Sequence, residues 1–246
     1  MLFIVLLFGI LVGSFLNVCI YRIPRKEDIV YTPSHCMSCG QQVKWYDLVP
    51  VFSWLALGGK CRYCKTKLSK QYPIIELSNG AAYMGVFFFL GFSPEAAVVC
   101  VLFSALLVAS MIDLRWKIIP NGIVIFILII GIIYLVVFSY TYIESVIGFL
   151  AVSVPLLLVN LITKGQMGMG DVKLMAVCGL VIGWQHILLA LMIGSIIGSI
   201  IGISLIALKI TSRKQQIPFG PYLSIGIMIA ALFGNSLIQM YLNFIF

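Results

Sequence analysis

Acidic side chains and histidines are scarce in this sequence. Only eight of the 246 residues are Asp or Glu, two are His, and charged residues make up 10% of the chain. The candidates for chemistry can therefore be found by elimination. Neither His35 nor His186 has a plausible Ser or Cys nucleophile as a partner, which argues against hydrolysis by a nucleophile and a histidine base.

Other signals are absent as well. The chain has no fixed-period repeat and no low-complexity tract, and the glycine fingerprint of a nucleotide-type cofactor is missing. Residues 1–20 lack the basic start of a cleaved signal peptide, so we expect them to remain as an anchor with the N-terminus outside. The net charge of +8 indicates contact with anionic lipid headgroups and not nucleic-acid binding.

Long apolar runs dominate the chain. It is 62% hydrophobic with a mean hydropathy of +1.12, whereas a soluble domain is roughly half apolar. Because a membrane span needs ~20 apolar residues, the pattern predicts an all-α polytopic membrane protein with about eight transmembrane helices. The candidate spans are residues 1–20, 76–92, 95–112, 119–139, 145–162, 172–184, 187–208 and 222–243.

The basic residues support this count because they follow every second span. The loops near 91–95, 140–144 and 184–186 contain none of them. The positive-inside rule makes the basic side cytoplasmic and leaves both termini outside. The basic residues are Arg22, Arg25, Lys26, Lys44, Lys60, Arg62, Lys65, Lys67, Lys70, Arg115, Lys117, Lys164, Lys173, Lys209, Arg213 and Lys214.

We expect a three-part organisation. Residues 1–20 form the first transmembrane helix, residues 21–75 a cytoplasmic segment with four cysteines, and residues 76–246 a seven-helix membrane core. The middle segment is too short to bury much of a core by itself. We therefore expect a covalent or metal cross-link within it.

Two Cys-x-x-Cys pairs supply the candidate cross-link. Cys36 with Cys39 and Cys61 with Cys64 can present four thiolates to a structural zinc ion. The reducing cytosol disfavours disulfides, so a redox pair or unligated thiols are the weaker alternatives. His35 adjoins the first pair and is poorly placed to bind the same ion.

Two acidic residues remain as catalytic candidates, because the other six lie in the soluble segment, in outer loops or at the start of the second span. Asp113 closes the third span and Asp171 opens the sixth, both at the cytoplasmic side. Two neighbouring carboxyls share one proton, so one can activate water while the other polarises a peptide carbonyl. The plainer alternatives are a helix N-cap for Asp171 and an interfacial charge for Asp113.

The surroundings of Asp171 favour the catalytic interpretation. Gly168 and Gly170 permit close backbone approach, and an extended substrate strand could pair with that backbone. Lys173 either neutralises Asp171 or extends to the interface, and we favour the second. Glu76 could contact the amino group of the substrate or a cofactor, or simply open a helix.

The ordered motifs resemble those of the type IV prepilin peptidases, a family of Gly-x-Gly-Asp aspartyl proteases. The resemblance runs almost from end to end and includes both cysteine pairs and both aspartates. The other matching segments are 13–18, 21–24, 50–54, 72–76, 119–121, 168–173 and 218–221.

The resemblance implies more than the residues show by themselves. It implies a bacterial inner-membrane enzyme that cleaves the basic leader of prepilins and pseudopilins after Gly at the cytoplasmic face. It also implies N-methylation of the new N-terminal residue with S-adenosylmethionine, an activity that rests on resemblance alone. The segment 218–221 is implied to lie near the active site.

Three rival functions remain. A presenilin-like or signal-peptide-peptidase-like protease would use the same chemistry, but the cysteine pairs and the segment 13–24 count against it. A transporter with intramembrane acids usually places them near the midplane, whereas both aspartates here are expected at the cytoplasmic ends of helices. The third rival is a zinc-scaffolded assembly factor without catalysis.

Overall fold

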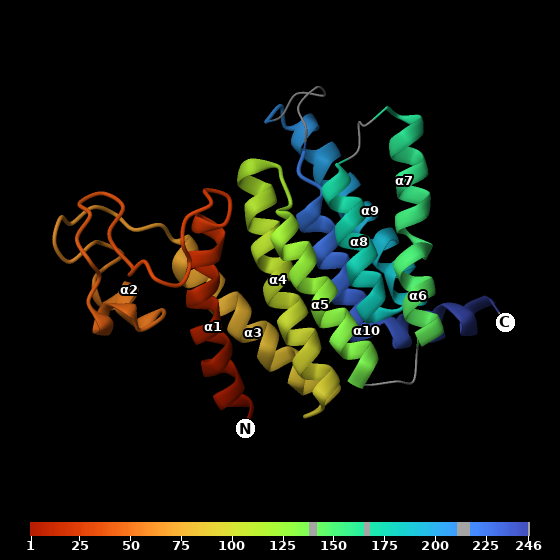
Figure 1. The fold of residues 1–246 in the computed structure, drawn as a ribbon, viewed down its shortest axis with the longest axis horizontal. Helices are drawn as coiled ribbons and strands as arrows, with labels where there is room; N and C mark the ends of the chain where they lie inside the picture. Colours follow the sequence, from red (N-terminus) through yellow and green to blue (C-terminus); the bar gives the residue numbers. More distant parts are fainter. Residues whose placement is uncertain (138–141, 165–167, 211–216, 246) are drawn as a thin grey trace. The chain divides into compact units, whose positions relative to one another are not determined.

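The computed structural model describes residues 1–137, 142–164, 168–210 and 217–245, and these residues are helical apart from their loops (Figure 1). Their only strand-like features are two isolated bridges, His35–Gln42 and Lys60–Lys67. The predicted all-α fold is confirmed. The elements are α1 (Leu2–Arg22), η1 (Trp45–Leu48), α2 (Phe52–Ala56), α3 (Gln71–Leu90), α4 (Pro94–Trp116), α5 (Asn121–Val137), α6 (Tyr142–Ala151), α7 (Ser153–Ile162), α8 (Met169–Ile182), α9 (Trp184–Ala207) and α10 (Gly220–Ile245).

The chain forms two compact units, Met1–Val108 and Ala109–Phe246, and α4 runs from the first into the second. These two units are defined by their internal contacts. The three-part organisation expected from the sequence divides the chain by the role of each part instead, and it stays a prediction. The first unit holds α1, α3 and the cysteine-bearing segment between them. The second unit holds both candidate aspartates.

The predicted count of about eight spans is too high by the criterion of length. Among the described residues, six helical stretches are long and apolar enough to cross a membrane, with α6 and α7 counted as one stretch. Helix α5 has 17 residues and α8 has 14. At ~1.5 Å per residue these are about 26 Å and 21 Å long, short of the ~30 Å hydrocarbon core. Helix α8 is short because it is bounded by Gly168 and by Gly183, which has a φ of 80°.

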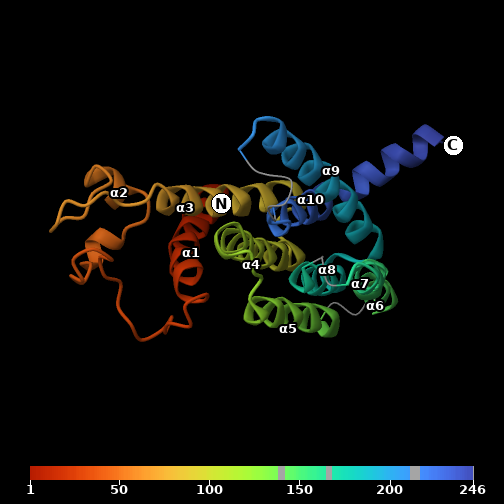
Figure 2. The ribbon, with the colours of Figure 1, turned by 90° about the horizontal axis from the view of Figure 1, so that it is seen from above.

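Helix α8 is the central helix of the second unit. It packs against α5, α6, α7, α9 and α10, and Figure 2 shows it from above among these neighbours. Leu174, Met175 and Cys178 are fully buried. Gly148 on α6 and Gly179 on α8 meet backbone to backbone. Since other helices cover α8 along its length, it need not span the lipid by itself.

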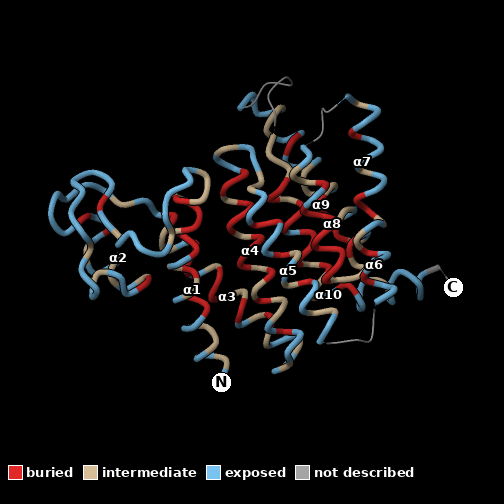
Figure 3. The backbone as a smooth tube through the Cα atoms, viewed as in Figure 1, coloured by how far each residue is buried: buried red, intermediate tan, exposed pale blue. Residues whose placement is uncertain are grey.

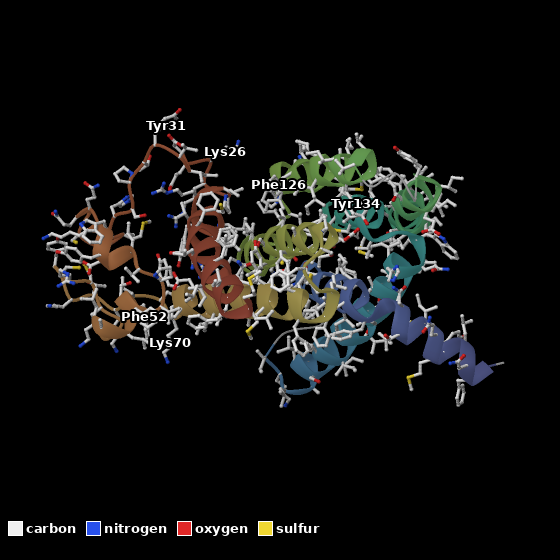
Figure 4. All side chains as sticks on the ribbon, turned by 90° about the horizontal axis from the view of Figure 1, so that it is seen from below. Lys26, Tyr31, Phe52, Lys70, Phe126 and Tyr134 are labelled. Atoms are coloured by element: carbon white, nitrogen blue, oxygen red, sulfur yellow. The ribbon has the colours of Figure 1, made fainter. Side chains whose placement is uncertain are left out.

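Large apolar side chains cover the outer faces of the helices. On α5, Ile125, Phe126 and Ile129 are about half exposed. Figure 3 shows much of α5 as exposed or intermediate, and Figure 4 labels Phe126 on this helix. A soluble protein rarely exposes apolar patches of such size, whereas lipid tails cover them at no cost. The chain is therefore a multi-pass membrane protein.

Small residues bring α1 and α3 close together in the first unit. A Cβ atom on Gly13 would lie 2.7 Å from the Cα atom of Glu76, so only glycine fits there. Buried amides add hydrogen bonds between the two helices: Asn79 donates to the carbonyl of Gly9 at 2.7 Å, and Asn17 donates to that of Tyr72 at 3.2 Å. These contacts hold Glu76 against α1.

The cysteine-bearing segment is shorter than expected. Because α1 continues to Arg22 and α3 already begins at Gln71, the segment between them is 23–70. Glu76 consequently lies in the second turn of α3 and does not open the helix. The guanidinium of Arg22 fixes the start of the segment by donating to the carbonyls of Asp28 and Thr32 at 2.9 and 2.8 Å.

Candidate functional site

Asp113 lies in the last turn of α4 and is 6% exposed. Its Oδ2 atom accepts a hydrogen bond of 2.9 Å from the backbone N–H of Gly220, the first residue of α10. A Cβ atom on Gly220 would lie 2.8 Å from the same oxygen. The glycine therefore lets the backbone reach the carboxyl and fixes its orientation.

Asp171 is the third residue of α8, whose N-cap is Gly168. The alternative that Asp171 is itself the N-cap is therefore wrong. A Cβ atom on Gly168 would lie 3.0 Å from the Oδ2 atom of Asp171, so the glycine leaves room for the carboxyl. The Asp171 carboxyl lies near enough to that of Asp113 for its charge to be felt, so carboxyls from α4 and α8 are neighbours within the second unit.

Gly170 is already inside the first turn of α8 and offers no extended backbone. The expected pairing with a substrate strand can therefore involve only the backbone before Met169. A Cβ atom on Gly170 would lie 2.9 Å from the Cβ atom of Ile119, in the loop after α4. Gly170 thus allows the start of α8 to approach the loop that follows Asp113.

Lys173 contacts the start of α5, directly after this loop. Its Nζ atom donates a hydrogen bond of 3.1 Å to the side chain of Asn121, the first residue of α5. Within the described part of the chain it forms no ion pair with Asp171. The structure thus shows Lys173 joining α8 to α5.

Basic residues of the second unit gather at the helix ends that carry the aspartates. They follow α4, lie in the second turn of α8, or follow α7 and α9, the helices that precede α8 and α10 in the chain (Figure 1). Arg213 and Lys214 lie outside the described residues. His186 lies at the start of α9 and contacts Asn235, so it is separate from the aspartates. The described basic residues are Arg115, Lys117, Lys164, Lys173 and Lys209.

Glu76, the remaining predicted site residue, belongs to the first unit. It is 5% exposed, and its Oε2 atom accepts a hydrogen bond of 2.7 Å from the backbone N–H of Val51. It lines a cavity of about 440 Å³ that is formed by α1, the start of α3 and the segment between them.

The four predicted metal ligands lie together in the first unit. The Sγ atoms of Cys36, Cys39, Cys61 and Cys64 all lie within 4.8 Å of one another, and those of Cys36 and Cys64 are 3.8 Å apart. A zinc ion bonded at about 2.3 Å to four thiolates separates them by about 3.8 Å. The donor set and its spacing therefore fit a tetrahedral metal ion.

The two cysteine pairs have the same backbone geometry. Gly40 donates to the carbonyl of Cys36, and Lys65 donates to that of Cys61 in the matching position. Both donors have positive φ angles, 69° for Gly40 and 57° for Lys65. The two turns are therefore alike, and their four thiols lie close together. A closed four-thiolate site requires this arrangement.

The thiols are electrostatically unequal without a cation. The hydrogen bond with Thr66 lowers the pKa of the Cys64 thiol to about 6. The backbone hydrogen bond from Gln41 lowers the pKa of the Cys39 thiol, but desolvation and the neighbouring Cys36 and Cys64 together outweigh it and raise this pKa to about 11. Four thiols this close cannot all ionise unless a bound cation compensates their charge.

Two site contacts were not predicted from the residues alone. Gly220 touches Asp113 across 107 positions of sequence, and only the resemblance of the segment 218–221 pointed to this region. Ile119, which packs on Gly170, belongs to the segment 119–121, which also resembles the family. Neither contact follows from composition or periodicity.

Two family models match the chain. Residues 7–90 match the Bacterial Peptidase A24 N-terminal domain, and residues 100–203 match the Type IV leader peptidase family. Three similar proteins are each named Prepilin leader peptidase/N-methyltransferase. The protein of Stutzerimonas stutzeri is 34% identical to this chain, and the match covers 97% of this chain and 93% of the relative. The protein of Pseudomonas aeruginosa is 32% identical, with 97% of this chain and 92% of the relative covered. The protein of Bacillus subtilis is 30% identical, with 99% of this chain and 98% of the relative covered. No solved structure matches the chain significantly.

Proposed function

Since this chain belongs to the type IV leader peptidase family, we propose that it removes the leader peptides of prepilins or pseudopilins by aspartyl protease chemistry. Asp113 and Asp171 are the catalytic pair in this proposal. The observation that supports it is that these two carboxyls, from the end of α4 and the start of α8, lie near enough for their charges to interact. Asp113 is buried and oriented by Gly220, as a catalytic group needs to be.

The two carboxyls divide the chemistry between them. Together they hold one proton, since two ionised carboxylates side by side repel each other. The ionised group takes a proton from water, and the resulting nucleophile attacks the scissile carbonyl carbon. The protonated group donates to the carbonyl oxygen, and a proton then passes to the leaving amine.

The site is cytoplasmic in this proposal. The basic residues of the second unit gather at the helix ends where the aspartates lie, and those of the first unit follow α1 or precede α3. The positive-inside rule assigns these ends to the cytoplasm of a bacterial inner membrane. Helix α1 then starts outside and α10 ends outside, which leaves both termini on the outer side.

We further assign zinc to the four thiolates. Zinc is favoured because a closed site of four thiolates suits its tetrahedral preference and serves structure rather than catalysis. Cys36, Cys39, Cys61 and Cys64 then cross-link a segment that contains little regular structure.

N-methylation is the second activity that we propose, on the basis of the names of the relatives. Bound S-adenosylmethionine supplies a methyl group that is activated by a sulfonium sulfur. The cavity of about 440 Å³ in the first unit falls in the range of sites for small molecules, roughly 300–1,000 Å³. Its lining includes the aromatic ring of Trp54 and the carboxylate of Glu76, which suit an aromatic base and a cation. The residues present therefore fit this cofactor.

Leader release by the purified protein tests the proposed protease directly. The detergent-solubilised chain is incubated with a synthetic prepilin peptide, and the products are followed by mass spectrometry. Wild type should release the leader, whereas Asp113→Asn and Asp171→Asn should each lose about 10²–10⁴-fold or more in rate. The amide has the shape of the carboxyl but cannot exchange the proton.

Glu144→Gln is the matched control, because Glu144 is an exposed carboxylate at the start of α6. It should cleave as wild type does. A transporter or an assembly factor would release no leader in any form. Near-normal turnover in either aspartate variant would refute the assignment of the pair.

A further inference from the structure

We propose that Asn160 on α7 is a substrate-binding residue of the protease site and that its side-chain amide pairs with one peptide group of the substrate strand. The inference rests on the proposed leader cleavage and adds a third residue to the two aspartates. The ligand that Asn160 recognises is the backbone of an extended polypeptide, not a particular side chain.

Asn160 lies in the last turn of α7 and is 6% exposed. Helix α7 packs against α8, and the end of α7 lies at the same end of the second unit as the start of α8 (Figure 1). The Nδ2 atom of Asn160 donates a hydrogen bond of 2.8 Å to the Sδ atom of Met169, the first residue of α8. Since Asp171 follows Met169 by two residues, Asn160 belongs to the surroundings of the proposed catalytic pair.

The hydrogen-bonding capacity of the Asn160 amide is poorly used. The thioether sulfur of Met169 is a weak acceptor. The Oδ1 atom of Asn160 is buried and has no hydrogen-bond partner among the described residues. Buried amides normally have partners at both ends, because an acceptor that has lost water without gaining a donor is costly. An unpaired oxygen beside a proposed active site therefore indicates a missing donor.

A purely structural role does not explain this amide. Its Oδ1 atom accepts from none of the described N–H groups at the start of α8, so Asn160 does not cap that helix. An apolar side chain would fill the same place in α7 without an unpaired oxygen. Within the described residues of the second unit, no other buried side-chain nitrogen or oxygen lacks a partner. The single exception lies next to the segment that carries Asp171.

The adjacent backbone has the conformation that a substrate strand can pair with. Gly168, the N-cap of α8, is extended, with a φ of −63° and a ψ of 118°. A strand beside it presents one N–H and one carbonyl per residue. A side-chain amide offers the complementary acceptor and donor. One substrate N–H can therefore donate to Oδ1 of Asn160, while Nδ2 donates to a substrate carbonyl.

Met169 acts as the cover of this amide. Its side chain contacts Asn160 and is 43% exposed. A methionine side chain has three rotatable bonds and adapts its position easily. The arriving strand displaces the thioether, and a peptide carbonyl replaces the weak sulfur acceptor. Both hydrogen bonds then form only with bound substrate, and they fix the peptide relative to Asp171.

The test uses the full-length protein in detergent and a series of prepilin peptides, each synthesised with a methyl group on one backbone nitrogen. Each methyl group removes one N–H donor. In the wild type, methylation at one nitrogen near the cleaved bond should raise the KM for leader release about tenfold, because the bond to Oδ1 is lost.

Asn160→Leu keeps the branching of the side chain and removes both polar ends. It should raise the KM of the unmethylated peptide about tenfold or more, with a smaller change in kcat, because the aspartates remain in place. Methylation of the nitrogen identified in the wild type should then have no further effect. The penalties at the other nitrogens should persist, as expected when only one pair of groups is coupled.

The outcomes separate the inference from the function on which it rests. If Asn160 only supports the structure, Asn160→Leu keeps the penalty at every nitrogen, and that result overturns the inference, as does an unchanged KM. In both cases the wild type still cleaves, so the proposed protease stands. A wild-type protein that releases no leader refutes the protease and this inference together.

Asn235→Leu is the matched control. Asn235 lies on α10 and contacts His186, away from the aspartates. This variant should keep the wild-type KM and every methylation penalty. Asn160→Leu should fold, because it removes an unpaired buried acceptor. If it does not, Asn160→Ala has a smaller side chain and takes its place in the same comparison, with the same outcomes for and against the inference.

Discussion

At the scale of single residues, Gly220 determines how the Asp113 carboxyl is held. We expect Gly220→Ala to lower the rate of leader cleavage by about a hundredfold, since a misplacement of about 1 Å at a catalytic group has that effect. The reason is the new Cβ atom, which would lie 2.8 Å from the Asp113 oxygen. The rate is measured on the prepilin peptide with the variant still folded.

Gly85→Ala is the matched control. Gly85 is also a helical glycine, but a Cβ atom there meets nothing within 4 Å. It should cleave at the wild-type rate. Full activity in Gly220→Ala would show that the Gly220 contact does not orient the carboxyl.

Asp113 and Asp171 could be selected as candidates from the sequence because the chain has only eight acidic residues and most of the others were expected in loops or in the soluble segment. The contact between Gly220 and Asp113 was not, since nothing in the local pattern joins residues 107 positions apart. The burial of Glu76 was also missed. It depends on the approach of Gly13 on α1 and on the strained Val51, both of which are tertiary features.

At the scale of elements, the cysteine turns make a prediction about metal. The purified protein should contain about one zinc ion per chain, and Cys36→Ser should lose it, because three thiolates leave the tetrahedral site open. Local unfolding should then weaken methyl transfer more than cleavage, since Cys36 and Cys61 line the cavity and the aspartates belong to the other unit. Elemental analysis and the two activity assays measure these effects.

Cys100→Ala provides the comparison, because Cys100 is buried in α4 away from the cluster and should leave the zinc content unchanged. A wild-type protein free of zinc, purified without chelator, would rule out the metal assignment. A Cys36→Ser protein that methylates normally but cannot cleave would reverse the proposed division of labour.

The apolar runs of the sequence predicted where the helices form, but they did not predict the length of every helix. Helix α8 was expected as a span at 172–184, yet it is a 14-residue helix between two glycines, buried by its neighbours. A sequence pattern cannot tell apolar residues that face lipid from those that face other helices. The start of α3 was placed too late, at residue 76, because the polar Gln71 precedes the apolar run, yet the helix begins at Gln71 and buries it.

At the scale of the whole molecule, the charge distribution predicts the topology. Reporter fusions after Lys70, Lys117, Lys164 and Lys209 should report the cytoplasm, because these positions lie at the basic helix ends. Fusions after 91, 142 and 183 should report the exterior. The short helices α5 and α8 are the sensitive part of this test. If the reporter fused after α5 or after α8 gives the opposite location, that helix does not carry the chain across the membrane.

The division into two compact units could not be read from the sequence. It depends on which helices contact each other, and α4 contributes to both units within one continuous apolar run. The sequence did predict a soluble segment after the first helix, because charge, cysteine and turn residues concentrate there.

The central claim is that Asp113 and Asp171 act as one catalytic unit, and a double-substitution cycle of leader cleavage tests it most directly. Single-turnover rates are measured for wild type, Asp113→Asn, Asp171→Asn and the double variant. Residues that share one proton lose their joint function with the first substitution, so the double variant should be no slower than the slower single variant. If the two rate losses instead multiply in the double variant, the aspartates act independently and the account of a shared site is wrong.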